Sequence, residues 1–173
     1  MKKIVAMVVM LFAFAAAQAV EVGYTVGSVK ARDTNVTGSV MQVAVQNGRV
    51  GAALQSLTIA NANRTEADVT YTLTGKGIHA TAGLGGVTQT GVKTHAVYLG
   101  EVGYDYAFEN KWTAGAAVGY KNDFERVVHD RQVTYTAKAS YAFSDATSVG
   151  LAYTRYNGDL RLNSLAVACT TKF

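Results

Sequence analysis

Three histidines are the residues of this chain best suited to acid–base chemistry: His79, His95 and His129. His129-Asp130, with Glu125 nearby, is the closest approach to a catalytic grouping. Hydrolysis of a lipid ester would need a serine activated by a histidine, and no His-x-Ser motif occurs. We therefore expect no enzyme, and we interpret the segment around His129 as a solvated loop of mixed charge.

Other kinds of site are also poorly supported. The glycine-rich segment 83–86 lacks the strand-to-helix context of a phosphate-binding loop. Cys169 is the only cysteine and has no ligand partners at a recognisable spacing, so we expect no metal and no cofactor. The net charge is only +4, and no basic stripe alternates with aromatic residues, which argues against a nucleic-acid partner.

The N-terminus has the three parts of a secretory signal. Lys2 and Lys3 precede an uncharged apolar run over residues 4–17, and Ala17-Gln18-Ala19 has the form of a cleavage site. The run is shorter than the roughly 20 residues that span a bilayer as a helix. We predict a signal peptide over residues 1–19, export by the Sec route, and one domain over residues 20–173.

Alternation with a period of two residues dominates the rest of the chain. Trp112, Ala114, Ala116, Val118 and Tyr120 are apolar, and small or weakly polar residues separate them. This pattern is typical of a strand with two unlike faces. The same pattern predicts ten strands, with eight as the alternative, and an even number places both chain ends together. The expected ranges are 21–30, 39–46, 49–59, 67–74, 77–85, 94–108, 111–121, 132–143, 147–156 and 163–173.

Turn signals separate these strands, and the chain contains no proline to interrupt them. Asn47-Gly48 is a strong signal for a two-residue hairpin. Longer connections are expected at about residues 31–38, 60–66, 86–93, 122–131 and 157–162. Three apolar residues, Val40, Leu57 and Ile59, break the alternation. A bulge or an early exit from the membrane would each explain the last two.

The aromatic residues indicate a membrane as the surrounding solvent. Nine of the ten tyrosines, all but Tyr156, lie on the apolar face of their strands. Trp112 and Tyr120 are eight residues apart, which corresponds to about 20 Å along the membrane normal for a strand tilted by about 40°. Aromatic belts mark the two bilayer–water interfaces. The predicted aromatic girdle contains Trp112, Tyr120, Tyr135, Tyr141, Tyr104 and Tyr106.

Charged residues fall on the opposite face, which a closed membrane barrel turns toward its lumen. The predicted polar network of the lumen contains Glu101, Asp105, Lys138, Asp68 and His79. We expect Glu101 and Lys138 to belong to one interior charge network. The alternative is that each is simply solvated in a wet lumen.

The last strand adds a motif. Leu165, Val167, Cys169, Thr171 and Phe173 share one face, and Phe173 is the final residue. This resembles the C-terminal signature of small bacterial outer-membrane β-barrels of the OmpA-transmembrane, OmpX and opacity-protein type. The resemblance implies an all-β fold, a closed antiparallel up-and-down transmembrane β-barrel, in a Gram-negative outer membrane. It also implies recognition of the Phe173 strand by the barrel-assembly machinery, contact with outer-membrane lipid and lipopolysaccharide, and a monomer.

Three functions remain open from the sequence. The first is a non-enzymatic barrel with a structural or surface-interaction role and a lumen mostly filled by side chains. The second is a narrow porin-like channel for small solutes, since glycine, alanine and threonine fill the inward face poorly. The third, a secreted lipocalin-like binding barrel, would turn the apolar face inward.

Overall fold

The fold is all-β. The computed structural model describes residues 20–34, 36–124 and 131–173; the predicted signal peptide and the His129-Asp130 and Glu125 group lie outside these residues. The strands are β1 (Val20–Ala31), β2 (Thr37–Asn47), β3 (Val50–Ile59), β4 (Ala62–Gly75), β5 (Ile78–Gln89), β6 (Val92–Ala107), β7 (Trp112–Asp123), β8 (Gln132–Ala142), β9 (Thr147–Gly158) and β10 (Leu162–Lys172). In the part of the chain so described, no helix is long and apolar enough to cross a membrane.

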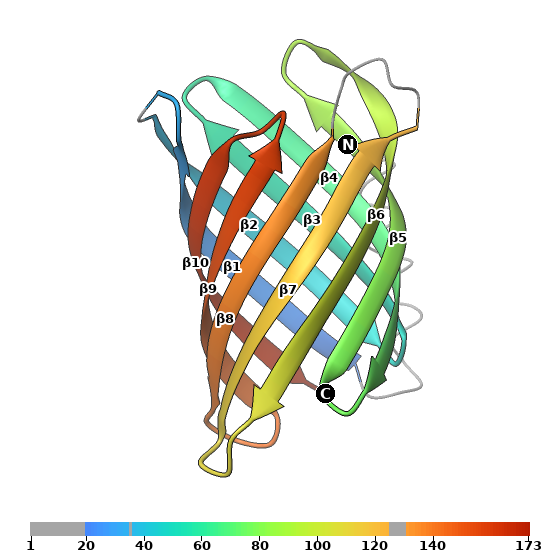
Figure 1. The fold of residues 1–173 in the computed structure, drawn as a ribbon, viewed down its shortest axis with the longest axis vertical. Helices are drawn as coiled ribbons and strands as arrows, with labels where there is room; N and C mark the ends of the chain where they lie inside the picture. The colour runs from blue at the N-terminus through green and yellow to red at the C-terminus, as the bar shows by residue number, and fades with distance from the viewer. Residues whose placement is uncertain (1–19, 35, 125–130) are drawn as a thin grey trace.

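Each strand pairs antiparallel with its sequence neighbours, and β1 pairs with β10 to close the barrel (Figure 1). Two backbone hydrogen bonds complete this seam, from Val20 N to Phe173 O at 3.2 Å and from Phe173 N to Val20 O at 2.9 Å. We call this end of the barrel the terminal end and the opposite end the loop end. The prediction of a closed up-and-down barrel of ten strands is confirmed, and the eight-strand alternative is wrong.

Two of the expected longer connections are tight turns instead. Residues 60 and 61 join β3 to β4, and residues 90 and 91 join β5 to β6. Ala60 and Gly91 adopt φ values of 51° and 76°, as such turns require. The strands extend into the segments expected to be loops because polar residues there, including Arg64 and Glu66, line the lumen in regular alternation.

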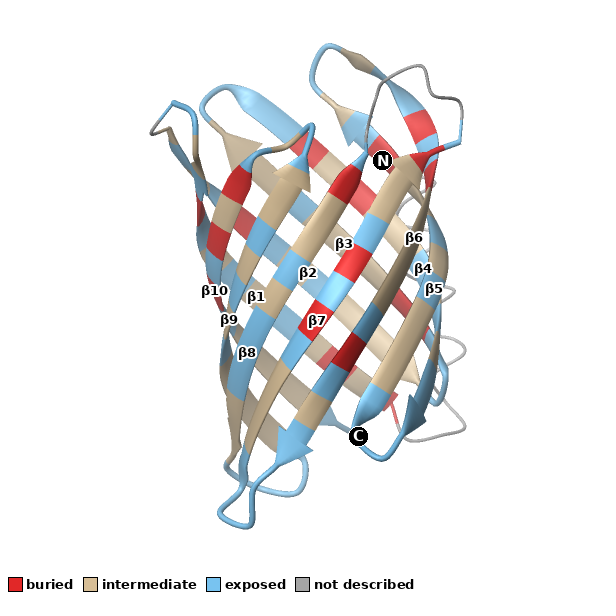
Figure 2. Cartoon of the chain, in the orientation of Figure 1, coloured by how far each residue is buried: buried red, intermediate tan, exposed pale blue. Residues whose placement is uncertain are grey.

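The barrel is inverted relative to a soluble one. Large apolar side chains are exposed on all ten strands, including Val102 and Val118 near mid-strand. Exposed and less exposed positions alternate along most strands (Figure 2). The apolar face therefore points outward, which contradicts the lipocalin-like interpretation.

The residues that break the alternation do so without a bulge. The β2–β3 ladder is continuous, with Val40 opposite Leu57 and Gly38 opposite Ile59. Val40 joins Val29 and Ala166 in a buried cluster, and Leu57 and Ile59 pack against it. The explanation based on a bulge is thus wrong: these apolar side chains fill the lumen at the loop end.

Closure predicts a specific crosslink. Tyr24 lies opposite Cys169 across the β1–β10 seam, and paired antiparallel residues have Cα atoms about 4.5–5.5 Å apart, within disulfide reach. We expect Tyr24→Cys to form a disulfide with Cys169 under mild oxidation of the folded protein. Non-reducing electrophoresis after denaturation measures it as a faster band. Val22→Cys, which lies opposite Thr171, is the matched control; equal crosslinking of both variants would contradict the register.

Candidate functional site: the barrel lumen

The lumen has two unlike halves. Its terminal half contains a cavity of about 650 Å³, which we call the terminal-half cavity. Inward-facing residues from most of the strands line it, and polar side chains predominate on its wall. Those used in the argument below are Asp68, Thr72, His79, Thr81, Glu101, Asp105 and Lys138.

Four of the five residues predicted for the polar network lie together in this cavity. The His79 ring on β5 lies between two carboxylates of β6, with Nε2 3.6 Å from Glu101 Oε1 and Nδ1 3.3 Å from Asp105 Oδ2. Lys138 on β8 places its Nζ 2.9 Å from Asp105 Oδ1. The chain of contacts thus links Glu101 to Lys138 through His79 and Asp105.

Inward glycines make room for this cluster. A Cβ on Gly103 would lie 2.4 Å from the His79 ring, and a Cβ on Gly115 would lie 1.9 Å from Asp105 Oδ1. Either Cβ would force the neighbouring side chain to shift, so each glycine lets the side chain of the neighbouring strand lie flat across it. Small residues of the inner wall therefore leave space for the charged side chains of neighbouring strands.

Asp68, the fifth predicted residue, belongs to a different group. It lines the loop-end limit of the terminal-half cavity and interacts with Glu66, two residues away on β4. Glu66 is the next inward residue of β4 and belongs to the ion pairs described next. The sequence could not separate Asp68 from the other four residues. Alternation predicts which face of a strand a side chain lies on, and it does not predict the position of that side chain along the barrel axis.

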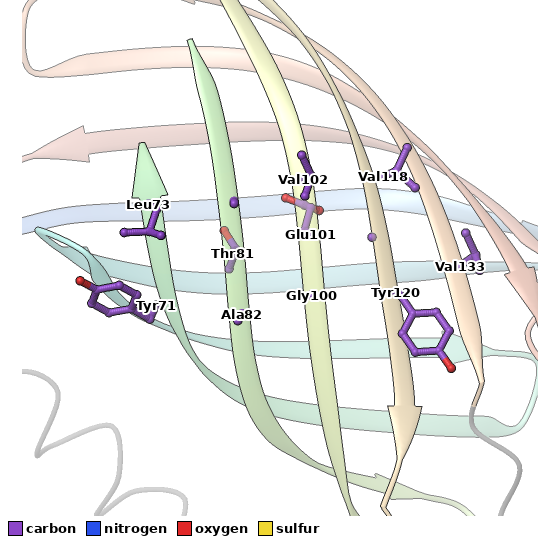
Figure 3. Close-up of a pocket in the computed structure, with 12 residues that line it drawn as sticks. Tyr71, Leu73, Thr81, Ala82, Gly100, Glu101, Val102, Val118, Tyr120 and Val133 are labelled. Atoms are coloured by element: carbon purple, nitrogen blue, oxygen red, sulfur yellow. The ribbon is translucent and has the colours of Figure 1, made fainter. Parts of the chain in front are cut away.

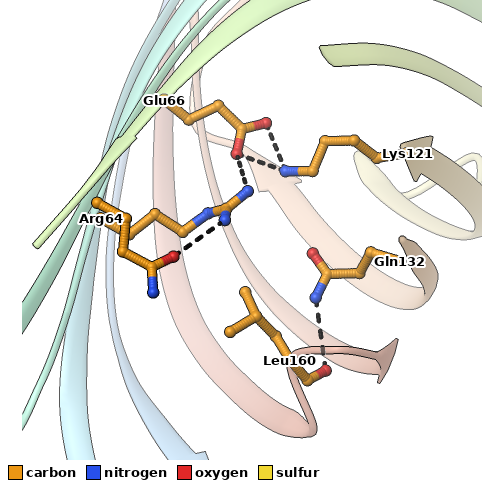
Figure 4. A network of polar contacts seen from close by, with 6 residues as sticks. Arg64, Glu66, Lys121, Gln132 and Leu160 are labelled. Carbon is orange, nitrogen blue, oxygen red and sulfur yellow. Dashed lines mark hydrogen bonds and ion pairs between the residues drawn. The ribbon is translucent and has the colours of Figure 1, made fainter. Parts of the chain in front are cut away.

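The loop half of the lumen is crossed by three charged residues, Arg64, Glu66 and Lys121, which we call the closing layer (Figure 4). Arg64 Nη2 lies 3.2 Å from Glu66 Oε2, and Lys121 Nζ donates to Glu66 Oε1 at 2.6 Å. The side chains of Arg64, Glu66 and Lys121 are only 8%, 6% and 15% exposed. Because β4 and β7 are not neighbours in the sheet, the Glu66–Lys121 ion pair spans the lumen.

Further side chains fill the space around the closing layer. Gln132 is buried and donates from Nε2 to Leu160 O at 3.4 Å (Figure 4). Arg32 Nη2 donates to Tyr156 O at 2.9 Å. Val87 and Val97 are fully buried at the same end. Polar and apolar side chains thus pack the loop half, whereas the terminal half stays hollow.

Sequence reasoning missed the closing layer for identifiable reasons. Residues 60–66 were expected to form a connection, which placed Arg64 and Glu66 outside the lumen. Lys121 fell at the very end of its expected strand. Lys121 has an odd residue number, as do Thr113 and Gly119 on the inward face of the same strand. This parity indicates that the Lys121 side chain points inward.

The predicted girdle residues lie on the outer face in two groups. At the terminal end, Trp112 and Tyr141 have ring centroids 5.2 Å apart, and Tyr106 contacts Phe108 at 4.8 Å. Tyr104 is exposed at the same end. At the loop end, the ring centroid of Tyr98 lies 6.2 Å from that of Tyr120 and 5.1 Å from that of Phe124. Tyr135 is exposed on the outer face of β8.

A shallow depression of about 580 Å³ lies between these aromatic groups on the outer face (Figure 3). The small residues Ala80, Ala82 and Gly100 line it, and Tyr71 and Tyr120 stand at its borders. Its lining is almost wholly apolar. It therefore offers a place for hydrocarbon.

The chemistry of the lumen is that of ion pairs and hydroxyl groups. Thr72 and Thr81 exchange a hydrogen bond of 3.0 Å in the cavity wall. Among the described residues, no three histidine, cysteine or acidic side chains are grouped so as to hold a metal ion. His79 contacts the carboxylates of Glu101 and Asp105, which can orient its ring.

Comparison with known proteins places the fold. No protein-family model matches the sequence, and no curated protein matches it. The NanC porin superposes with a TM-score of 0.54 at 9% identity, over 87% of this chain and all (100%) of that one. The KdgM porin gives a TM-score of 0.51 at 12% identity, over 90% of this chain and 99% of that one. The chain therefore has the fold of the outer-membrane β-barrels.

Proposed function

We propose that the protein is an integral outer-membrane barrel that is closed to solutes in its resting state and has a structural or surface-interaction role. The terminal end faces the periplasm and the loop end faces outward, the orientation usual for barrels with an even number of strands. The proposal assigns no catalytic role to any residue.

The observation that carries the proposal is the closing layer. A small solute entering from the loop end would have to separate Glu66 from Lys121 and Arg64, three side chains that are nearly inaccessible to water. Breaking a buried ion pair costs several kcal/mol because it leaves a desolvated charge without its partner. The layer therefore acts as a fixed barrier at thermal energies.

The outer face supports a location in the membrane. Its exposed side chains include Leu84, Val102 and Val167, and aromatic groups lie toward both ends of the barrel. Exposing so much apolar surface to water would be unfavourable by about 25 cal/mol for each Å². Closure leaves no strand edge unpaired, which a bilayer requires.

A narrow porin-like channel is the second candidate. The terminal-half cavity of about 650 Å³ favours it, since the cavity has a polar wall and extends to Gly48 in the β2–β3 turn. For this second candidate, the side chains of the closing layer would have to separate, so that the cavity becomes continuous with the solvent at the loop end.

Several predictions from the sequence stay part of this proposal. They are the signal peptide over residues 1–19 with Sec export, recognition of the Phe173 strand by the assembly machinery, contact with lipopolysaccharide, and a monomeric state.

Planar-bilayer recordings separate the two candidates. We expect the wild-type protein to give no sustained conductance steps. Replacing the closing layer by Arg64→Ser, Glu66→Ser and Lys121→Ser removes the ion pairs and most of the side-chain volume. This variant should show discrete steps.

The matched control is Asp105→Ser with Lys138→Ser, which removes an ion pair from the hollow half and should stay silent. Heat-modifiable gel mobility checks that all variants are folded. Steps in the wild type as large as those of the triple variant would favour the porin-like candidate. Silence of a folded triple variant would show that the closing layer is not the barrier.

Lipid contact predicts a depth-dependent effect of charge. Val167 is exposed at the middle of β10, and Thr171 lies on the same face near the terminal end. We expect Val167→Lys to lower the free energy of unfolding in vesicles by about 2–4 kcal/mol and Thr171→Lys by about 0–1 kcal/mol. Denaturant titration with Trp112 fluorescence measures both. Equal effects would argue against a membrane-spanning band.

A further inference from the structure

Only two charged side chains lie on the outward face of the described strands, Lys30 of β1 and Arg155 of β9, and both are cations. Each is exposed and alternates with the apolar outward residues of its strand, such as Val26 and Tyr153. The other charged residues of the described strands have inward parity. A cation on the lipid side of a barrel is costly at the bilayer midplane and is tolerated near the interface, where its side chain can reach charged groups of the lipid heads.

The two cations lie in one row. Arg155 is the register partner of Asn163 on β10, and Asn163 is the register partner of Lys30 on β1. Since neighbouring strands are about 4.8 Å apart, the backbones of the two cations are separated by about 10 Å, with the Asn163 amide between them. Both side chains are long enough to converge on a group placed above Asn163.

Neither cation has a partner among the described residues, since no ion pair or hydrogen bond of either side chain is found there. The same edge of the barrel carries two more cations, Arg32 and Arg161, against two carboxylates, those of Asp33 and Asp159. The loop end of β9, β10 and β1 is therefore positively charged. The corresponding outward edge of β6 and β7 carries the aromatic residues Tyr98 and Tyr120 instead.

The surface directly toward the terminal end of this row is apolar. Tyr153 and Leu165 lie in the next outward row, and Leu151, Val167 and Val26 lie in the row after it. All five are exposed. A ligand that fits both parts of this surface has an anionic head at the membrane boundary and hydrocarbon chains below it.

We propose that Lys30, Asn163 and Arg155 bind a phosphate group of lipid A in the outer leaflet, with its acyl chains on the apolar strip formed by Tyr153, Leu165, Leu151, Val167 and Val26. The inference rests on the proposed function, because it requires the loop end to lie at the outer leaflet. Lys and Arg donate charge-assisted hydrogen bonds to phosphate, and Asn163 supplies an amide donor. The phosphate supplies the compensation that the protein itself lacks.

Binding of lipid A to the folded protein in neutral detergent micelles tests this proposal, with native mass spectrometry as the readout. Lys30→Gln with Arg155→Gln should weaken binding of phosphorylated lipid A about tenfold to thirtyfold. Lys76→Gln with Lys93→Gln removes the same charge from exposed sites elsewhere and should leave binding unchanged. Lys30→Arg with Arg155→Lys keeps both charges and should restore binding.

Dephosphorylated lipid A should bind the wild type and the double glutamine variant equally weakly. Equal loss in the Lys76/Lys93 control, or unchanged binding in the Lys30/Arg155 variant, would overturn the site. Phosphatidylglycerol that binds as tightly as lipid A and is lost in the same variant would overturn the assignment to lipid A. Heat-modifiable mobility and insertion into vesicles are measured first: a protein that does not insert fails the proposed function, whereas an inserted barrel that fails these assays contradicts this inference alone.

Discussion

Pairing β1 with β10 is the constraint on which the rest of the structure depends. Hydrocarbon offers no partner for backbone N–H and C=O groups, so a sheet within a bilayer has to close on itself. Once closed, the period of two assigns each residue to the lipid or to the lumen. Three features follow from that assignment: the outward apolar surface, the inward charges, and the space that Gly103 and Gly115 leave for neighbouring side chains.

The lumen uses its inward residues differently along its length. Toward the terminal end, charged side chains pair along the wall, as His79 does with Glu101 and Asp105, and leave the centre hollow. Toward the loop end, Glu66 and Lys121 reach across to one another from strands that are not neighbours. Inward charged residues can therefore either line a cavity or block it, depending on their position along the barrel axis.

Much of this architecture could be predicted from the sequence, because alternation and turn chemistry are local signals. The ten strands and the outward position of Trp112 and Tyr120 are of this kind. Contacts across the lumen depend on barrel curvature and on the stagger between strands, which no local pattern encodes. That is why Asp68 was grouped with Lys138 and why Leu57 and Ile59 suggested a bulge. The closing layer was missed because residues 60–66 were expected to form a connection.

The central claim is that even-numbered residues of β7 face lipid and odd-numbered residues face the lumen. A nitroxide scan of a Cys169→Ser protein in vesicles, at residues 113, 114, 116, 117, 118 and 120, tests it directly, because oxygen concentrates in lipid and a nickel chelate stays in water. We expect oxygen accessibility to be high at residues 114, 116, 118 and 120 and low at residues 113 and 117. Reversed alternation, or none, would contradict the account.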